Sequence, residues 1–345
     1  MNASWQTFLE SRGAVIQADR VLHFGNAPAE LHDACNQPIV ADLSDLGLIQ
    51  FAGEDAQTFL QGQLSNDLRL LDGSNSQLTS FCTPKGRMLA NFLLWQDAPN
   101  SYLAQLPECL RGAIQKRLSM FVMRAKVKVT DASDAWVRMG VGGMGAQAVI
   151  EQLFGMAPPL AHGLLHHANA CVLRLPGDLF ELLIAPEQAS AIWIQLTSQA
   201  KPVGTSIWDG QLIRAGIPTI LPGTQEAFVP QMVNYELIGG VNFKKGCYPG
   251  QEIVARTQYL GKLKRRMYVA HLKVDTAPTP GDSLFSADFP DQATGVIVNA
   301  APALTGGYDV LAVIQLSSVE GNAIHWKSMD GPTLALGKLP YDVPA

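Results

Sequence analysis

The stretch KKGCYPGQE, residues 244–252, holds the residue types in this chain that are best suited to chemistry. Its cysteine, Cys247, follows two lysines, Lys244 and Lys245, and precedes a Tyr-Pro-Gly turn. Nearby cations and the positive end of a following helix favour the thiolate, which is the reactive form of cysteine. Cysteine is also common as a small buried side chain, so a reactive thiol and a packing role both stay open.

The residues around Cys247 predict a fixed loop followed by a helix. Tyr248 precedes a proline and is therefore restricted to extended backbone, while Gly250 accepts backbone angles that other residues avoid. We expect the helix over residues 251–260. The loop would hold Cys247 in one place at the start of that helix.

Basic side chains are concentrated in and after this loop, although the whole chain has a net charge of −5. Residues 244–266 contain one acidic residue, Glu252. The basic residues there are Lys244, Lys245, Arg256, Lys262, Lys264, Arg265 and Arg266. This surplus favours an anionic ligand or partner, either nucleic acid or a polycarboxylate cofactor. Lysines that protect a solvated strand edge are the alternative.

Trp208, in SIWDGQLIRAGIP, falls on a helix that we expect over residues 205–214. Its indole could stack on a heterocycle, but a tryptophan on a helix is more often a core residue, and both roles stay open. The five cysteines and seven histidines show no spacing typical of metal ligands. No metal site is predicted.

An α+β body followed by a small antiparallel β-barrel is the predicted architecture. Helices are expected from the Gly53-Glu54-Asp55 turn to Leu71 and over residues 110–121, 146–153, 187–197 and 205–214, with strands between them. After residue 261, short strand-like runs separated by Pro, Gly and Asp predict the barrel. We therefore expect one domain over residues 1–261 and a second over 262–345.

Length and composition predict a cytoplasmic protein with more than one domain. A chain of 345 residues is too long for one ordinary core. Scattered cysteines, odd in number, fit a reducing compartment. No apolar run approaches the roughly 20 residues that a membrane helix needs, and the first residues do not resemble a signal peptide.

Five stretches together resemble the YgfZ-type folate-binding proteins, which are related to the glycine cleavage T-protein, an aminomethyltransferase. They are FLQGQLSNDLRLL (59–71), FCTPKGRMLANFLLW (81–95), LIRAGIPTILPG (212–223), FVPQMVNYELIGGVNFKKGCYPGQEIVAR (228–256) and ATGVIVNAAPAL (293–304). The resemblance implies a three-lobed fold with two interleaved N-terminal lobes around a central channel, a C-terminal barrel, and bound tetrahydrofolate or a derivative. It also implies a role in assembly or repair of iron–sulfur clusters in client enzymes, with an indirect effect on tRNA modification. We expect a monomer.

Carried onto this sequence, the resemblance implies a functional thiol at Cys247 with Lys245 beside it. The implied folate-binding residues are Trp208, Lys245, Tyr248, Gln251, Glu252 and Arg256. Two positions depart from the relatives. Arg214 replaces an acidic residue, which puts pterin recognition by that carboxylate in doubt, and Leu46 replaces an aromatic residue that some relatives have.

The aspartate pair that related aminomethyltransferases use is replaced here by Ala90 and Asn91. Neither side chain can exchange a proton near neutral pH, so we expect no aminomethyl transfer. Two alternatives stay open. One is a folate-dependent one-carbon transferase whose aspartates lie elsewhere, and the other is a tRNA-binding modification factor that uses the basic residues 262–266.

Overall fold

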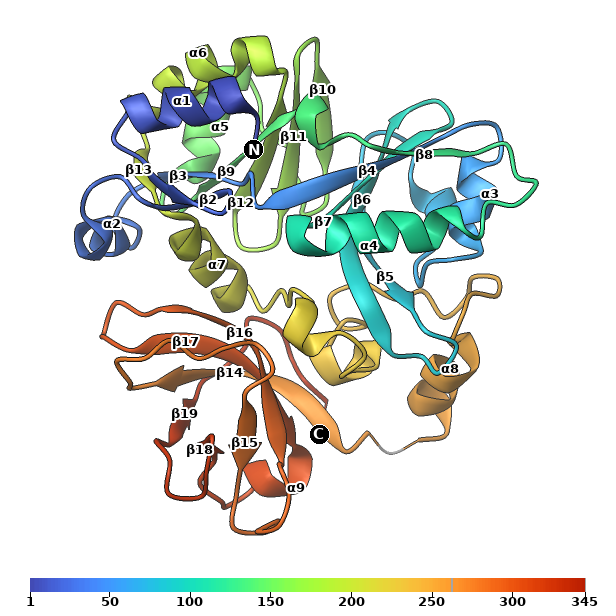
Figure 1. Ribbon diagram of the computed structural model, residues 1–345, viewed down its shortest axis with the longest axis vertical. Helices are drawn as coiled ribbons and strands as arrows, with labels where there is room; N and C mark the ends of the chain where they lie inside the picture. The colour runs from blue at the N-terminus through green and yellow to red at the C-terminus, as the bar shows by residue number, and fades with distance from the viewer. Residues whose placement is uncertain (262, 345) are drawn as a thin grey trace. The chain divides into compact units, whose positions relative to one another are not determined.

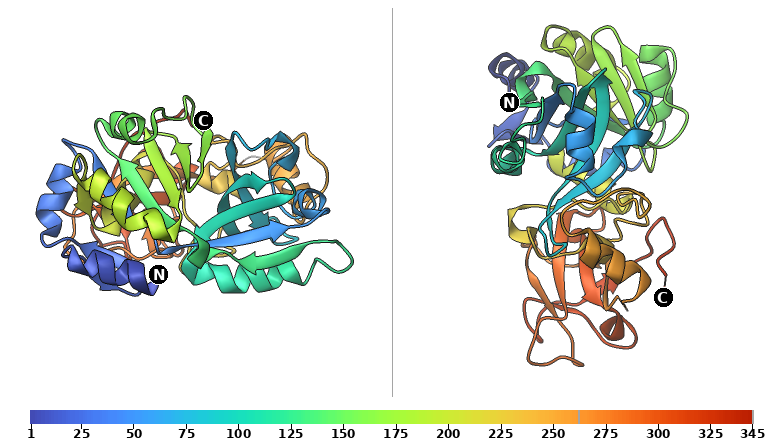
Figure 2. Two further views of the ribbon diagram at one scale, coloured as in Figure 1. Left: turned by 90° about the horizontal axis from the view of Figure 1, so that it is seen from above. Right: turned by 90° about the vertical axis from the view of Figure 1, so that its right-hand side faces the viewer.

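The computed structural model describes residues 1–261 and 263–344, and it contains two compact units (Figures 1 and 2). Unit 1 comprises Met1–Phe59, Arg69–Gln77 and Leu93–Gln211. Unit 2 comprises Leu60–Leu68, Leu78–Phe92 and Leu212–Ala345. The domain boundary expected at residue 262 stays a prediction, and Lys262 itself lies outside the described residues.

The helices are α1 (Ala3–Ser11), α2 (Ala27–Asp33), α3 (Ala56–Gln61), α4 (Glu108–Ser119), α5 (Ala146–Phe154), α6 (Pro186–Thr197), α7 (Thr205–Arg214), α8 (Gln251–Tyr259) and α9 (Leu316–Val319). The helices expected from the sequence are confirmed in α4 to α8 to within a few residues. The helix expected from the Gly53-Glu54-Asp55 turn to Leu71 is confirmed at its start, but its extension beyond Gln61 is wrong. α3 ends at Gln61, directly before a glycine, and Leu64 instead forms a β-bridge with Phe81.

Unit 1 contains a six-stranded sheet whose order is β10-β11-β12-β9-β3-β13. Its strands are β3 (Ile39–Asp42), β9 (Val137–Gly142), β10 (Leu164–His167), β11 (Ala170–Leu175), β12 (Leu179–Ile184) and β13 (Lys201–Val203). Only the β13–β3 pair is parallel among its described pairs. A two-stranded ribbon, β1 (Val15–Gln17) and β2 (Arg20–His23), lies in the same unit.

A second sheet has the order β5-β6-β7-β4-β8. Its strands are β4 (Leu46–Ala52), β5 (Ser76–Cys82), β6 (Met88–Ala98), β7 (Ser101–Pro107) and β8 (Lys128–Asp131). Strands β4, β7 and β8 belong to unit 1, and the chain passes between the units within β5 and β6. Long apolar runs in β6 and β7 explain why both strands are largely buried.

One face of the six-stranded sheet packs against helices α1, α5 and α6, which lie together over it in Figure 1. Phe180, Leu182 and Ile184 of β12 point into this core, together with Trp193 of α6. Because successive residues of a strand point to opposite faces, residue 181 between them lies on the other face of the sheet.

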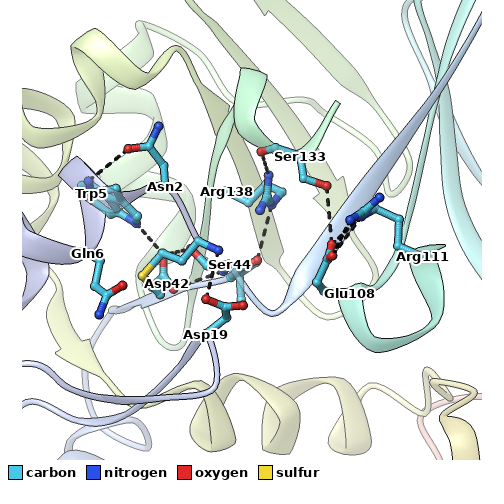
Figure 3. A network of polar contacts seen from close by, with 12 residues as sticks. Asn2, Trp5, Gln6, Asp19, Asp42, Ser44, Glu108, Arg111, Ser133 and Arg138 are labelled. Atoms are coloured by element: carbon cyan, nitrogen blue, oxygen red, sulfur yellow. Dashed lines mark hydrogen bonds and ion pairs between the residues drawn. The ribbon is translucent and has the colours of Figure 1, made fainter. Parts of the chain in front are cut away.

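A polar network ties the start of α1 to strands β3 and β9 in unit 1 (Figure 3). The buried carboxylate of Asp42 accepts hydrogen bonds from Trp5 Nε1 at 2.7 Å and Ser44 Oγ at 2.9 Å. Burial raises the pKa of Asp42, and these hydrogen bonds oppose the shift. Arg138 of β9 is also buried and donates to the carbonyl of Trp136 at 2.8 Å. These buried contacts lie at the ends of β3 and β9 within unit 1.

The predicted barrel at the end of the chain is confirmed. Its six strands are antiparallel in the order β18-β15-β16-β17-β14-β19. They are β14 (Arg265–Leu272), β15 (Ser283–Phe285), β16 (Gly295–Pro302), β17 (Tyr308–Gln315), β18 (His325–Trp326) and β19 (Leu334–Leu336). Hydrogen bonds from Trp326 N to Pro332 O and from Leu334 N to Ile324 O nearly close it.

Candidate functional site

Cys247 is exposed on a loop that is held against the turn at residues 83–87. Both segments have a glycine with positive φ, Gly250 at +82° and Gly86 at +71°. A Cβ atom on Gly250 would lie 2.5 Å from Thr83 O and 2.6 Å from the Gly86 Cα atom. Only glycine permits this approach. The fixed loop is confirmed and a buried packing role for Cys247 is wrong, while the function of its thiol stays a prediction.

Lys245 is buried and anchors the same loop to the end of α3. Its Nζ atom donates to the carbonyl of Gln61 at 2.7 Å and to the carbonyl of Leu64. The ammonium group also lies 5.1 Å from the centroid of the Tyr248 ring. A cation is favourable there because the last carbonyls of a helix carry partial negative charge. Lys245 therefore stabilises the loop, and a direct effect on Cys247 stays a prediction.

Other residues expected at the site divide into buried and exposed groups within unit 2. Tyr248 is buried, and burial raises its pKa above the ordinary value. Gln251 Nε2 donates to the carbonyl of Lys245 at 3.4 Å. Glu252 and Arg256 are exposed on α8. Unit 2 therefore brings Lys245, Tyr248 and Gln251 together around the base of the loop, and their contacts with folate stay predictions.

Among the described residues of the basic run at 244–266, two of the basic side chains are buried instead of facing solvent. Lys245 is buried, and so is Arg266, which forms an ion pair with Glu236 and donates to the carbonyl of Gln231 at 3.0 Å. Burial raises the pKa of Glu236, and Arg266 opposes that shift. Part of the charge surplus in the sequence therefore holds β14 in place instead of facing solvent.

Asn91, at the position of a transferase aspartate, clamps the extended segment at residues 218–220. Its Nδ2 atom donates to Pro218 O at 2.7 Å, and its Oδ1 atom accepts from Ile220 N at 2.9 Å. Asn299 of β16 holds Thr219, the residue between them, in the same way. Its Oδ1 atom accepts from Thr219 N at 2.9 Å, and its Nδ2 atom donates to Thr219 O at 2.9 Å. Each asparagine imitates a strand's backbone by donating and accepting at once. Ala90 beside the first clamp is fully buried.

Trp208 lies in unit 1 on α7, apart in sequence from the Cys247 loop in unit 2. Its indole is buried, as expected of a core residue, and its rings face Gly140 of β9. A Cβ atom on Gly140 would lie 2.7–2.8 Å from the indole carbons. The indole Nε1 atom has no hydrogen-bond acceptor among the residues described. A ligand with an acceptor atom fits this unsatisfied donor, so the residues present are compatible with a heterocycle at Trp208.

Arg214 and Leu46, the two positions at which the sequence departs from the relatives, lie in different units. Arg214 Nη1 in unit 2 is 4.0 Å from the Asp309 Oδ2 atom, so a carboxylate of the barrel faces the arginine. Leu46 begins β4 and pairs with Pro107 in unit 1. These contacts are ordinary packing and ion pairing, and they leave the effect of both departures on folate binding as a prediction.

Sequence reasoning missed a buried polar pair in unit 1, Gln105 of β7 and Glu181 of β12. Gln105 Nε2 donates to Glu181 Oε2. The signal in the sequence is a single polar residue inside an apolar strand, YLAQLP and LFELLI.

Among residues 1–261 and 263–344, no group of three or more His, Cys, Asp and Glu side chains could hold a metal ion. No helix in the same residues is long and apolar enough to cross a bilayer.

Comparison with known proteins gives consistent matches over most of the chain. Residues 6–208 match the GCVT N-terminal domain family. The tRNA-modifying protein YgfZ of Sodalis glossinidius is 30% identical over 305 residues, covering 87% of this chain and 92% of the relative. That of Pectobacterium carotovorum is 28% identical over 325 residues, covering 93% and 97%.

The fold also matches a solved structure. Aminomethyltransferase T of the glycine cleavage system from Bartonella henselae superposes with a TM-score of 0.81 at 18% identity, covering 98% of this chain and 97% of that one. The likeness shows that the two chains share a fold. It confirms the predicted fold class, including the barrel at the C-terminal end.

Proposed function

The chain belongs to the YgfZ family of proteins with a GCVT N-terminal domain, and from this premise we propose that it is a tetrahydrofolate-binding accessory factor. Its clients would be enzymes whose iron–sulfur clusters it helps to assemble or repair. An effect on tRNA modification would then arise through cluster-dependent enzymes. A cytoplasmic monomer that binds folate and these client proteins is part of the proposal.

The exposed thiol of Cys247 is the observation that carries this proposal. The side chain is accessible, although the residues on both sides of it are fixed by the Lys245 anchor and the Gly250 turn. A cysteine that needs neither packing nor a disulfide partner is available as a nucleophile or as a ligand for a soft metal. Iron–sulfur clusters are held by cysteine thiolates.

Asn91 supports an accessory factor over an aminomethyltransferase. Both ends of its amide are occupied by backbone hydrogen bonds, and the neighbouring Ala90 has no polar atom on its side chain. Neither residue could take up or release a proton from a bound amine. The position therefore serves the fold.

Trp208 and the loop around Lys245 support folate binding in different ways. The unsatisfied Nε1 donor of Trp208 fits an acceptor on a pterin or its linker. Lys244 and Arg256 are exposed cations that suit the carboxylates of a glutamate tail. Tetrahydrofolate would supply a carrier for one-carbon groups when bound.

Titration of the purified protein with tetrahydrofolate, followed by tryptophan fluorescence or calorimetry, tests folate binding. Trp208→Ala should weaken binding about fivefold or more, because aromatic contacts of this kind contribute about 1 kcal/mol. Gly112→Ala, in an open position on α4, is the matched control. An unchanged affinity in Trp208→Ala would remove this residue from the site.

A deletion strain assayed for several cluster enzymes tests the role of the thiol. Cys247→Ser should bind folate normally and fail to restore cluster-enzyme activity, because serine is a far weaker nucleophile and soft-metal ligand. Cys109→Ser, which changes another exposed cysteine, should restore it fully. Complementation by Cys247→Ser at normal abundance, or turnover of an aminomethyl donor by the purified protein, would overturn the proposal.

A further inference from the structure

Helix α8 lies back along the segment of unit 2 that carries Cys247. Gly250 ends that segment and is the N-cap of α8. At the other end of the helix, the ring of Tyr259 meets the ring of Phe243 edge-on, with 5.9 Å between the ring centroids. Cys247 lies in the chain between these two contacts. The segment and the helix therefore belong to one continuous surface.

The turn at residues 83–87 continues this surface beside the first turn of α8. A Cβ atom on Gly86 would lie 3.1 Å from the Ile253 Cβ atom, and Lys85 next to it is exposed. A Cβ atom on Gly246 would meet no atom within 4 Å. The space beside Cys247 is therefore open to a second molecule.

The outer side of α8 is apolar where a surface helix is ordinarily polar. Ile253, Tyr259 and Leu260 are 38%, 68% and 85% exposed, whereas Val254 is buried and packs the helix onto the unit. Positions 253, 256 and 260 have the spacing of one helical stripe. Single exposed apolar residues are common, but a stripe of them with polar neighbours indicates a contact surface.

Exposed cations lie on the same segments. They are Lys85 on the turn, Lys244 before Cys247, Arg256 on α8 and Lys264 shortly after α8 in the chain. Glu252 is the one acidic residue of α8. In a chain with a net charge of −5, this local surplus of positive charge favours an acidic partner.

The residue types favour a polypeptide partner over RNA. Nucleotide bases bind by stacking on aromatic rings or guanidinium planes, and the side chains of Ile253 and Leu260 offer neither. Tyrosine and arginine are enriched at the centres of protein–protein interfaces, and lysine is found at their rims. Tyr259 and Arg256 between two aliphatic side chains fit the first pattern, and the lysines fit the second.

We propose that the outer face of α8, formed by Ile253, Arg256, Tyr259 and Leu260, docks an acidic segment of the iron–sulfur client proteins. Apolar side chains of the client cover the stripe, and its carboxylates pair with the surrounding cations. Docking on this face brings the client next to the open side of the Cys247 segment. The inference rests on the proposed function and deepens it, because it names the surface that binds the clients.

Paired substitutions in the full chain test the apolar and the charged parts of this face in the deletion strain. Tyr259→Ser with Leu260→Ser should lower the restored cluster-enzyme activity at least threefold at equal abundance. Lys85→Glu with Lys264→Glu should lower it by a similar factor. The affinity for tetrahydrofolate and the alkylation rate of Cys247 should change less than twofold in both variants.

The matched control removes two apolar side chains that are as exposed but lie in unit 1. Met123 and Leu160 are 89% and 74% exposed, and Met123→Ser with Leu160→Ser should restore the activity fully.

Photo-crosslinking identifies the occupant directly. Replacement of Leu260 by the photo-reactive residue p-benzoylphenylalanine should give crosslinks to the cluster enzymes whose activity the deletion strain lacks. The same replacement at Met123 should not. Adding Lys85→Glu and Lys264→Glu should lower the yield at position 260 at least threefold, because the client segment is acidic.

The outcomes separate this inference from the proposed function. If the wild-type protein restores no cluster enzyme, the proposed function fails, and this inference fails with it. If the wild type restores them and both paired variants do so equally well, only this inference is overturned. An equal loss in the unit 1 control overturns it too, and so do crosslinks from position 260 to RNA, to lipid, to a second copy of the chain or to nothing.

Discussion

Replacing Asn91 by aspartate tests whether this position serves the fold or can serve catalysis. The amide donates to Pro218 O at 2.7 Å and accepts from Ile220 N at 2.9 Å in a buried setting. An aspartate can keep both hydrogen bonds only while it is protonated, because an ionised carboxylate has no donor. Ionisation would leave Pro218 O unpaired and place a charge against it.

The expected cost follows from these two effects. An unpaired buried acceptor costs about 1–3 kcal/mol, and a buried charge adds to that, so we expect Asn91→Asp to be destabilised by roughly 3 kcal/mol at pH 7. The folded pKa of the new carboxyl group would be raised above its unfolded value of about 3.9. Its stabilising, protonated form is therefore fully present below about pH 4. The stability is lost as pH rises through the folded pKa, by about 1.4 kcal/mol per pH unit.

Urea unfolding of the wild type and the variant at several pH values between 4 and 8 measures this loss. Asn299→Asp is the matched control, since Asn299 makes the same two contacts with Thr219 but is only half-buried, and its loss should be smaller. The reasoning is refuted if Asn91→Asp loses stability equally at every pH, or if it is as stable as the wild type at pH 7. Aminomethyl turnover by the variant would show that the position can still serve catalysis.

Three further predictions concern the anchors of the fold and site. Lys245→Met should lower stability by about 1–3 kcal/mol in urea unfolding, because the carbonyls of Gln61 and Leu64 lose their donor. Lys244→Met, at an exposed neighbour, should change stability by less than about 0.5 kcal/mol. Gly140→Ala should shift the tryptophan emission and lower the free energy of unfolding by about 1–3 kcal/mol, since the new Cβ would overlap the Trp208 indole. An unchanged emission spectrum would contradict the packing of Trp208 against Gly140. The raised pKa of Glu181 makes its protonated form the stabilising one, so the wild type should lose stability as pH rises from about 4.5 to 7. Glu181→Gln has no such carboxyl group, and its stability relative to wild type should therefore increase over this range by up to roughly 3 kcal/mol. A stability difference that does not depend on pH contradicts this.

The barrel and most helices follow from the sequence because their signals are local. Alternating apolar residues between Pro, Gly and Asp turns predict short strands, and those strands are observed in β14 to β18. The helix expected to continue to Leu71 ends at Gln61 for a reason that is not local. Its leucines have helical spacing, but Gly62 follows the end of α3 and the carbonyls of Gln61 and Leu64 bind a lysine about 180 residues further along the chain.

The candidate site shows the same division between local and distant signals. Cys247 and its glycine turn could be predicted because the necessary residue types are adjacent in the chain. Gln105 and Glu181 could not be paired in advance, because each is a lone polar residue in an apolar strand. Only the register of two different sheets brings them together. The same holds for Asn91, whose residue type excludes proton transfer but does not reveal the backbone segment that it holds.

The basic residues of the run 244–266 differ in burial, and this matters for the tRNA-binding alternative. A tRNA-binding face needs several free cations, because affinity for a polyanion grows with the number of phosphates neutralised. The run from residue 244 to 266 is rich in cations, but Lys245 caps the end of α3 and Arg266 is paired with Glu236. Both side chains are buried, so neither can reach a phosphate without breaking contacts that hold the loop or the barrel. The structure thus removes two of the seven cations from a phosphate-binding face, while Lys244, Arg256 and Lys264 stay exposed, and the tRNA-binding alternative stays a prediction.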